Sequence, residues 1–184
     1  MTGEVGERAP VRSRRLWIWM VTVGVAVVAV DQLSKLWAVS ALTGRAPVTV
    51  IPGLIDLRLL YNPGAAFSLG RGSTWVFAVA AAGTVAGILY YGRRLGSLAW
   101  TLGLGLVLGG AASHLLDRLF RDPGFARGHV VDFIDYKGFF VGNIADIMLV
   151  GAVGLLLALN ARGIQIDGTR ETGAADPGSD PSPA

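Results

Sequence analysis

Four long apolar runs dominate this chain and constrain its fold more than any other feature. They cover Leu16 to about Val39, Thr74 to Tyr91, Gly96 to Leu116 and Asn143 to Leu159. A helix needs roughly 20 apolar residues to cross about 30 Å of hydrocarbon, and each run is near that length. Only 16% of the residues are charged, well below the roughly 25% of a soluble domain. The sequence therefore predicts an α-helical integral membrane protein with four transmembrane helices.

The segments around these runs predict one membrane domain with polar ends. We expect residues 1–15 to form a cytoplasmic N-terminal segment and residues 16–160 to form the four-helix domain. Residues 161–184 are rich in Gly, Pro, Asp and Ser, which predicts a disordered cytoplasmic tail. The connections at 40–73 and 117–142 contain the strand-like stretches IDLRLL and HVVDFIDY. These stretches predict a small strand-containing region on the extracytoplasmic side.

Small residues at helical spacing indicate where the helices approach one another. Gly83 and Gly87 lie four residues apart in the second run, and Gly105 and Gly109 have the same spacing in the third. Such pairs allow two helix backbones to come close together. We therefore expect both pairs to lie at helix–helix contacts.

The first apolar run shares some features with a cleavable signal peptide. It follows an arginine-rich start, and Ala38 and Ser40 imitate a cleavage site. Asp31 and Lys35 lie between the apolar stretch and that site, where signal peptides rarely carry charge. We therefore interpret the run as a retained membrane helix.

Polar residues gather on one side of the predicted bundle. Because consecutive helices cross in opposite directions, the end of the first helix, both long connections and the start of the fourth helix share one side. An ionisable side chain inside a membrane helix is unfavourable and usually functional. This one-sided group predicts a site near one leaflet surface. Its members are Asp31, Lys35, Asn62, His114, Asp117, Arg118, Asp132, Asn143 and Asp146.

The positive charges indicate which side of the membrane holds this group. The side with the polar group carries seven arginines and lysines outside the helices and the opposite side carries eight, so the totals barely discriminate. The density of arginine in residues 1–15 and the usual dominance of the first helix favour a cytoplasmic N-terminus. We therefore expect both termini in the cytoplasm and the polar group at the outer face.

Several chemistries are disfavoured by the residues present. The chain has no cysteine, which removes thiol catalysis, disulfides and Cys-based zinc sites. Its two histidines lie far apart in sequence, so we expect no metal and no cofactor. The neighbours Ser34–Lys35 and Ser113–His114 do not face each other on a helix. The net charge of +3 is small and its arginines cluster at segment ends, which predicts no nucleic-acid partner.

The chain contains five short motifs that include polar residues. They are DQLSK at 31–35, YNPGAAFS at 61–68, GGAASHLLDR at 109–118, GHVVDFID at 128–135 and GNIAD at 142–146. In this order, over roughly residues 16–160, they resemble the lipoprotein signal peptidase family, also called signal peptidase II. Each motif alone is weak evidence, but five in order are highly specific. The resemblance implies a bacterial inner-membrane endopeptidase that removes signal peptides from prolipoproteins before a diacylglyceryl-modified cysteine.

The same resemblance implies roles for the polar residues. It makes Asp132 and Asp146 the catalytic pair of an aspartyl peptidase with its active site near the outer leaflet. Partners would be diacylglyceryl-modified prolipoproteins and membrane lipids, with the protein acting as a monomer. The implied substrate-contacting residues are Asn62, His114, Arg118 and Asn143. The implied supporting polar residues are Asp31, Lys35 and Asp117.

The chain departs from the family pattern in three places. Ser113 and His114 stand where the family usually has Gly-Asn, although an imidazole can still donate a hydrogen bond. Gly142 stands where the family usually has Phe. The stretch between the two aspartates is also shorter than the family leads us to expect.

Two neighbouring carboxyl groups suit peptide hydrolysis on chemical grounds. Carboxylates a few ångströms apart do not both ionise readily, so one keeps a proton. The charged member can take a proton from water, which then attacks the scissile carbonyl. The protonated member can donate to the carbonyl oxygen or to the leaving nitrogen. The two groups titrate as a pair.

Simpler structural interpretations apply to several of these residues. Asp31 and Lys35 are four residues apart on a helix and can neutralise each other. Asp117 can serve as an interfacial anchor at a helix end. The aspartates that we interpret as solvated surface are Asp56, Asp122 and Asp135.

Two other function classes remain open from the residues alone. A small proton-coupled transporter would need a polar path across the membrane, and the second and third helices offer none. A non-catalytic homologue would bind lipoproteins without cutting them. The substitution at His114 favours that class, and the presence of both Asp132 and Asp146 disfavours it.

Overall fold

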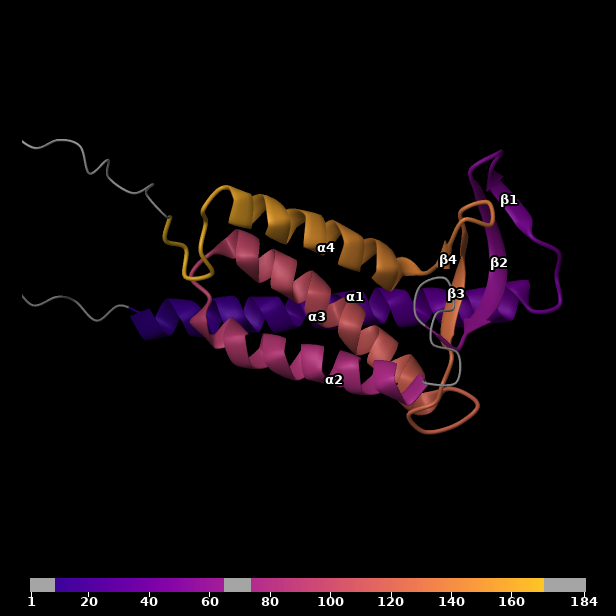
Figure 1. The fold of residues 1–184 in the computed structure, drawn as a ribbon, viewed down its shortest axis with the longest axis horizontal. Helices are drawn as coiled ribbons and strands as arrows, with labels where there is room; N and C mark the ends of the chain where they lie inside the picture. Colours follow the sequence, from indigo (N-terminus) through magenta and orange to yellow (C-terminus); the bar gives the residue numbers. More distant parts are fainter. Residues whose placement is uncertain (1–8, 65–73, 171–184) are drawn as a thin grey trace, which may run out of the picture.

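Four helices and a small sheet make up the protein (Figure 1). The computed structural model describes residues 9–64 and 74–170. Each of the four helices is long and apolar enough to cross a membrane. The predicted fold class, four transmembrane helices with a small strand-containing region, is confirmed. The helices are α1 (Ala9–Leu42), α2 (Thr74–Tyr91), α3 (Leu98–Phe120) and α4 (Ile144–Ala161), with a short 3-10 turn, η2 (Gly92–Arg94), between α2 and α3.

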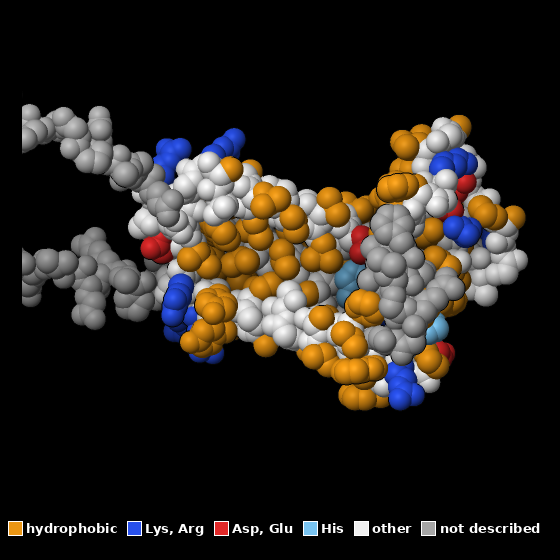
Figure 2. Space-filling view, in the orientation of Figure 1, with side chains coloured by type: hydrophobic (Ala, Val, Ile, Leu, Met, Phe, Trp, Pro, Cys, Tyr) orange, Lys and Arg blue, Asp and Glu red, His pale blue; other side chains and the backbone are white. Residues whose placement is uncertain are grey.

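The surface of the bundle fits a membrane environment. On the face shown in Figure 2, apolar side chains cover the helices, whereas Lys and Arg side chains gather at the two ends. The first and last described residues lie at the same end of the bundle, opposite the sheet (Figure 1). The chain therefore crosses the bundle an even number of times, as the apolar runs predict.

Helix α3 lies at the centre of the bundle and packs against the other three helices. Gly105 and Gly109 make its approach to α1 possible, because a Cβ atom at either position would come within 2.8 Å or 2.5 Å of Val23 or Val27. The packing prediction is correct for this pair. It is wrong for Gly83 and Gly87 in α2, where an added Cβ atom would meet nothing within 4 Å.

The sheet lies across one end of the bundle (Figure 1). Its antiparallel strands run in the order β1 (Val48–Ile51), β2 (Ile55–Asn62), β3 (Val130–Asp135) and β4 (Val141–Gly142). Both strand-like stretches of the sequence lie in it. Phe133 of β3 packs on Ala38 and Leu42 at the end of α1, which fixes the sheet to the bundle.

The pairing of β2 with β3 brings two distant motifs together. Leu60 lies opposite Asp132, and Asn62 lies opposite Val130. The motif around Asn62 therefore begins beside the strand that carries Asp132. The rest of that motif, residues 65–68, lies outside the described residues.

The segment that follows α4 is ordered up to Arg170, so the disorder predicted for residues 161–184 is wrong over its first part. Ile164 pairs with Arg170 in an isolated bridge, and its carbonyl oxygen accepts a 2.8 Å hydrogen bond from the indole of Trp100. Ile166 packs against the apolar cluster around Leu95. Backbone hydrogen bonds and two isoleucines thus hold an otherwise polar stretch against the end of the bundle. Residues 171–184 lie outside the described residues.

Candidate active site

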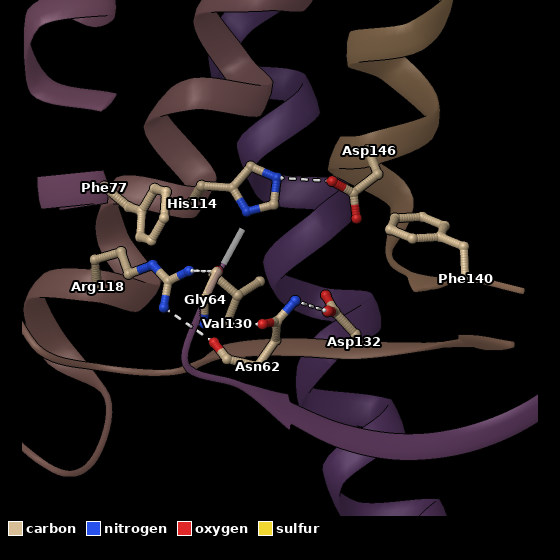
Figure 3. A pocket seen from close by; sticks show the side chains of 9 residues that line it. All are labelled: Asn62, Gly64, Phe77, His114, Arg118, Val130, Asp132, Phe140 and Asp146. Carbon is tan, nitrogen blue, oxygen red and sulfur yellow. Dashed lines mark hydrogen bonds and ion pairs between the residues drawn. The ribbon is translucent and has the colours of Figure 1, made fainter. Parts of the chain in front are cut away.

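A cavity of about 190 Å³ lies where α3, α4, β2 and β3 converge (Figure 3). Five residues predicted as catalytic or substrate-contacting line it together. The sixth such residue, Asn143, is hydrogen-bonded to two of them, Asp132 and Asp146. The lining consists of Asn62, Gly64, Phe77, His114, Arg118, Val130, Asp132, Phe140 and Asp146.

Asp132 extends into the cavity from β3 and is only 2% exposed. Both of its carboxylate oxygens accept side-chain amide hydrogen bonds: Oδ2 from Asn62 at 2.9 Å and Oδ1 from Asn143 at 2.7 Å. Burial raises the pKa of Asp132 to about 6, and the negative charge of Asp146 adds to the rise, while the two amide donors oppose it. Asp132 therefore binds a proton far more readily than a solvated aspartate does.

Asp146 lies in the first turn of α4 and is held by a capping box. The side chain of Asn143 accepts from the backbone N–H of Asp146 at 3.1 Å, and Oδ2 of Asp146 accepts from the backbone N–H of Asn143 at 3.0 Å. Its other oxygen lies 3.1 Å from Nε2 of His114. A carboxylate in this position also benefits from the positive end of the helix dipole.

Asn143 is hydrogen-bonded to both aspartates of the cavity. Its side-chain nitrogen donates to Asp132, whereas its side-chain oxygen and backbone N–H bind Asp146. The sequence carries a signal for half of this arrangement, because Asn followed three residues later by Asp is a capping pattern. The link to Asp132 depends on the fold.

Arg118 lines the cavity, but its hydrogen bonds go to the protein backbone. Its guanidinium donates to the carbonyl oxygens of Asn62 at 3.0 Å and Gly128 at 3.1 Å, and also to that of Gly64. It also lies over the ring of Phe77, 5.6 Å from the ring centre. Arg118 therefore holds the end of β2 against the start of β3, a structural role beside the substrate contact that the sequence predicts.

The three supporting residues form one buried ionic cluster behind the cavity. The ammonium nitrogen of Lys35 lies 2.5 Å from Oδ2 of Asp31 and 2.7 Å from Oδ2 of Asp117, and all three side chains are fully buried. Neutralisation of Asp31 by Lys35 along one helix accounts for only half of this cluster. Asp117, interpreted as an interfacial anchor, is a second buried partner of the same lysine.

Each carboxylate of this cluster also holds the backbone beside one cavity aspartate. Oδ1 of Asp31 accepts from the N–H of Ala145 at 2.8 Å, immediately before Asp146. Oδ2 of Asp117 lies 3.4 Å from the N–H of Val131, immediately before Asp132. Lys35 thus connects the supports of both cavity aspartates.

Several polar contributors were missed from the sequence. Ser113 donates to Asp31 at 2.6 Å, and Gln32 donates to Ser113 at 2.9 Å and to Asp117 at 3.0 Å. Uncharged side chains on apolar helices carry little signal of their own. The aromatic lining, Phe77 of α2 and Phe140 of the turn between β3 and β4, was also missed.

One aspartate assigned to solvated surface is buried. Asp135 is 6% exposed, lies 3.0 Å from Nε of Arg58 across the sheet and accepts from the N–H of Gly138 at 2.7 Å. A cross-strand arginine allows an aspartate to be buried on a strand. Asp56 pairs with Lys137 at 2.7 Å, and Asp122 is exposed as predicted. Within the described residues, no group of three or more acidic or histidine side chains is arranged to hold a metal ion.

Comparisons with known proteins agree on one family. The family model described as "Signal peptidase (SPase) II" matches residues 23–161. The chain is 46% identical over 162 residues to the lipoprotein signal peptidase of Rhodococcus jostii (strain RHA1), covering 88% of this chain and 81% of that protein. It is 43% identical over 176 residues to the lipoprotein signal peptidase of Mycolicibacterium smegmatis (strain ATCC 700084 / mc(2)155), covering 96% and 74%.

Two solved structures share the fold. One bacterial membrane enzyme superposes with a TM-score of 0.68 at 24% identity, covering 85% of this chain and 93% of that one. A second superposes with a TM-score of 0.66 at 25% identity, covering 77% and 91%. The family match over most of the membrane domain, and relatives at 43% and 46% identity, show that the chain belongs to the signal peptidase II family.

Proposed function

We propose that this protein is an aspartyl endopeptidase that removes signal peptides from bacterial prolipoproteins, cutting before the diacylglyceryl-modified cysteine. The observation that carries the proposal is the placement of Asp132 and Asp146 in one cavity, joined through Asn143. Two carboxyl groups that share a proton are the chemical requirement for such a peptidase. The family assignment does not favour the transporter or the non-catalytic alternative.

The surroundings of the two carboxyl groups indicate which one acts as the proton donor and which one as the base. Burial favours the neutral form of Asp132, whose pKa is near 6. Asp146, at the N-terminus of α4 and beside His114, is placed to carry the negative charge. Asp146 then takes a proton from a water molecule, and the resulting hydroxide attacks the scissile carbonyl carbon. Asp132 donates a hydrogen bond to the carbonyl oxygen.

Collapse of the tetrahedral intermediate breaks the C–N bond. The leaving nitrogen receives a proton from the carboxyl pair and departs as the new amino terminus of the lipidated cysteine. The other product is the signal peptide with a free carboxylate, so one water is consumed per bond cut. No covalent bond between enzyme and substrate is required. Asn62 and Asn143 hold Asp132 in place throughout.

We also propose that the cavity faces the outer leaflet and that both termini are cytoplasmic. The arginine density near the N-terminus and the shared end of the first and last described residues support this orientation (Figure 1). The active unit would be a monomer in contact with membrane lipids, because one chain completes the cavity.

The chain contains no cysteine, so single cysteines can be introduced to test the orientation by labelling. Cysteines replacing exposed Arg45 and Arg127 should react with an impermeant thiol reagent from outside the cell. One replacing Arg94 should react only after permeabilisation, and the reverse pattern would overturn the orientation.

The test of the catalytic proposal is replacement of each cavity aspartate by asparagine. Asp132→Asn and Asp146→Asn preserve side-chain shape, but an amide can neither take up nor give up a proton as the carboxyl pair must. Each should insert into the membrane normally and yet fail to cleave a purified diacylglyceryl-modified prolipoprotein. Asp122→Asn and Asp56→Asn, outside the cavity, serve as matched controls and should cleave normally. Cleavage near the wild-type rate by either cavity variant would exclude the two-aspartate mechanism.

A further inference from the structure

A second hollow lies directly beside the catalytic cavity. It is a groove of about 380 Å³ between the β3–β4 turn and the outer face of α4. Asn143 and Asp146 stand at its head, and the rest of its lining is apolar, including Phe139, Ile147 and Val150. The groove therefore begins at the proposed reaction centre and continues along a membrane helix.

The ring of Phe140 separates the two hollows. Phe140 and Asp146 are the residues that line both of them among those described. In Figure 3 the ring lies beside the carboxylate of Asp146, on the side away from His114. Phe140 is thus the wall of the catalytic cavity on the α4 side.

The turn that carries Phe140 is held in place by several contacts. The carbonyl oxygen of Phe140 accepts from the N–H of Tyr136 at 2.8 Å, and the two rings stack at 6.2 Å with an angle of 21° between their planes. Lys137 and Gly138 turn the chain with φ angles of 52° and 80°, and Asp135 accepts from the N–H of Gly138. The position of the wall is therefore set by the fold of the turn.

Gly142 leaves the space that this ring occupies. A Cβ atom at position 142 would lie 2.5 Å from Cε1 of Phe140 and 2.9 Å from Oδ2 of Asp146. Neither distance is possible for a real side chain without displacement of the ring or the carboxylate. The absence of a side chain at Gly142 therefore allows the ring of Phe140 to lie beside the carboxylate of Asp146.

We propose that Phe140 is a specificity-determining residue, whose ring limits the size of the substrate side chain that precedes the scissile bond. This inference rests on the proposed function. The residue after the bond is fixed as the modified cysteine, so selection by size acts on the residue before it. A cavity of about 190 Å³ that also holds the attacking water and the substrate backbone favours a small side chain at that position. Loss of the ring would join the cavity to the larger groove.

The experiment compares two diacylglyceryl-modified prolipoproteins that differ only in the residue before the cysteine, alanine or leucine. The wild-type protein should prefer the alanine substrate. Phe140→Ala should reduce the ratio of the two kcat/KM values by about tenfold or more, the scale on which hydrophobic pockets discriminate by size. Phe140→Leu should give an intermediate ratio. Phe139→Ala removes a neighbouring ring that lines the groove but not the cavity, and it should leave the ratio unchanged.

The outcomes separate this inference from the proposed function. Failure of the wild-type protein to cleave either substrate would overturn the proposed function. Normal cleavage with the same ratio in wild type and Phe140→Ala would overturn only the role of Phe140. Loss of all cleavage in both folded Phe140 variants would place the ring in the catalytic machinery and overturn selection by size.

Discussion

The side-chain amide of Asn143 donates a 2.7 Å hydrogen bond to Oδ1 of Asp132, from the position that also caps the helix carrying Asp146. One residue thereby connects a strand and a helix that approach the cavity from different directions. A change at Asn143 should disturb the two aspartates through different atoms, and these effects can be separated by choice of substitution.

Asn143→Ser should keep the cap and lose the bond to Asp132. Serine is as good a helix cap as asparagine, but its hydroxyl is too short to replace the amide donor. Asp132 is protonated in the proposed mechanism, and a hydrogen bond between neutral groups contributes about 0.5–1.5 kcal/mol. Cleavage should therefore fall roughly threefold to tenfold with little change in the unfolding midpoint. Asn143→Ala should lower both, because it also removes the cap. Cleavage by Asn143→Ser at the wild-type rate would show that the amide has no part in the reaction.

Lys35→Met should strongly destabilise the protein. The substitution keeps the volume of the side chain but leaves Asp31 and Asp117 buried without their shared cation. Breaking a buried ion pair from one side typically costs about 3–5 kcal/mol. The thermal unfolding midpoint in detergent should fall well below that of the wild type.

The same substitution at Lys137 provides the matched control. Lys137 also pairs with an aspartate, but its side chain is 40% exposed. Exposed pairs contribute little, so Lys137→Met should leave the midpoint almost unchanged. Equal midpoints for the two variants would mean that the buried cluster does not support the fold.

His114→Ala should reduce cleavage roughly tenfold to a hundredfold, because a hydrogen bond to a charged group such as the proposed base Asp146 is worth about 1.5–3 kcal/mol. His114 lies 3.1 Å from Asp146 through Nε2, which is a contact to the proposed base rather than to substrate. His114→Gln should retain most of the activity, since its amide nitrogen can reach the position of Nε2. If alanine and histidine give equal rates in a purified assay, His114 is a packing residue.

The sequence predicts the helices better than it predicts their ends. Helix α2 has the predicted bounds because its apolar run stops at polar residues on both sides. Helix α3 continues to Phe120, past the predicted end at Leu116, because Asp117 and Arg118 are buried by partners from other elements. A hydropathy profile contains no information about partners from other elements. It therefore places the end of the helix at the first buried polar residues.

For the site too, the sequence predicts the residues involved better than it predicts their contacts. The motifs around Asp132, Asp146 and Asn62 predict which residues meet, because the order of helices places them on one side. Their mutual contacts depend on the β2–β3 register and on the side of α4 that faces β3. The role of Phe140 depends on a turn whose shape follows from Lys137 and Gly138 at positive φ. Local sequence therefore identifies the ionisable groups of the site, while the tertiary fold determines its walls.

The last prediction concerns the pH dependence of cleavage. The proposed mechanism needs Asp132 protonated, and its pKa is about 6 because the side chain is buried and Asp146 lies nearby. The kcat/KM value should therefore fall as the pH rises through about 6, when Asp132 loses its proton. The amide of Asn62 stabilises the ionised form and holds this pKa down. Asn62→Ala removes that bond, so the pKa of Asp132 should rise. The alkaline limb of the pH profile, where kcat/KM falls, should then move to higher pH, whatever the change in maximal rate. Asp122→Asn, at an exposed position, should leave the limb where it is. A limb that stays in place or moves to lower pH in Asn62→Ala would show that Asp132 is not the group whose protonation controls the reaction.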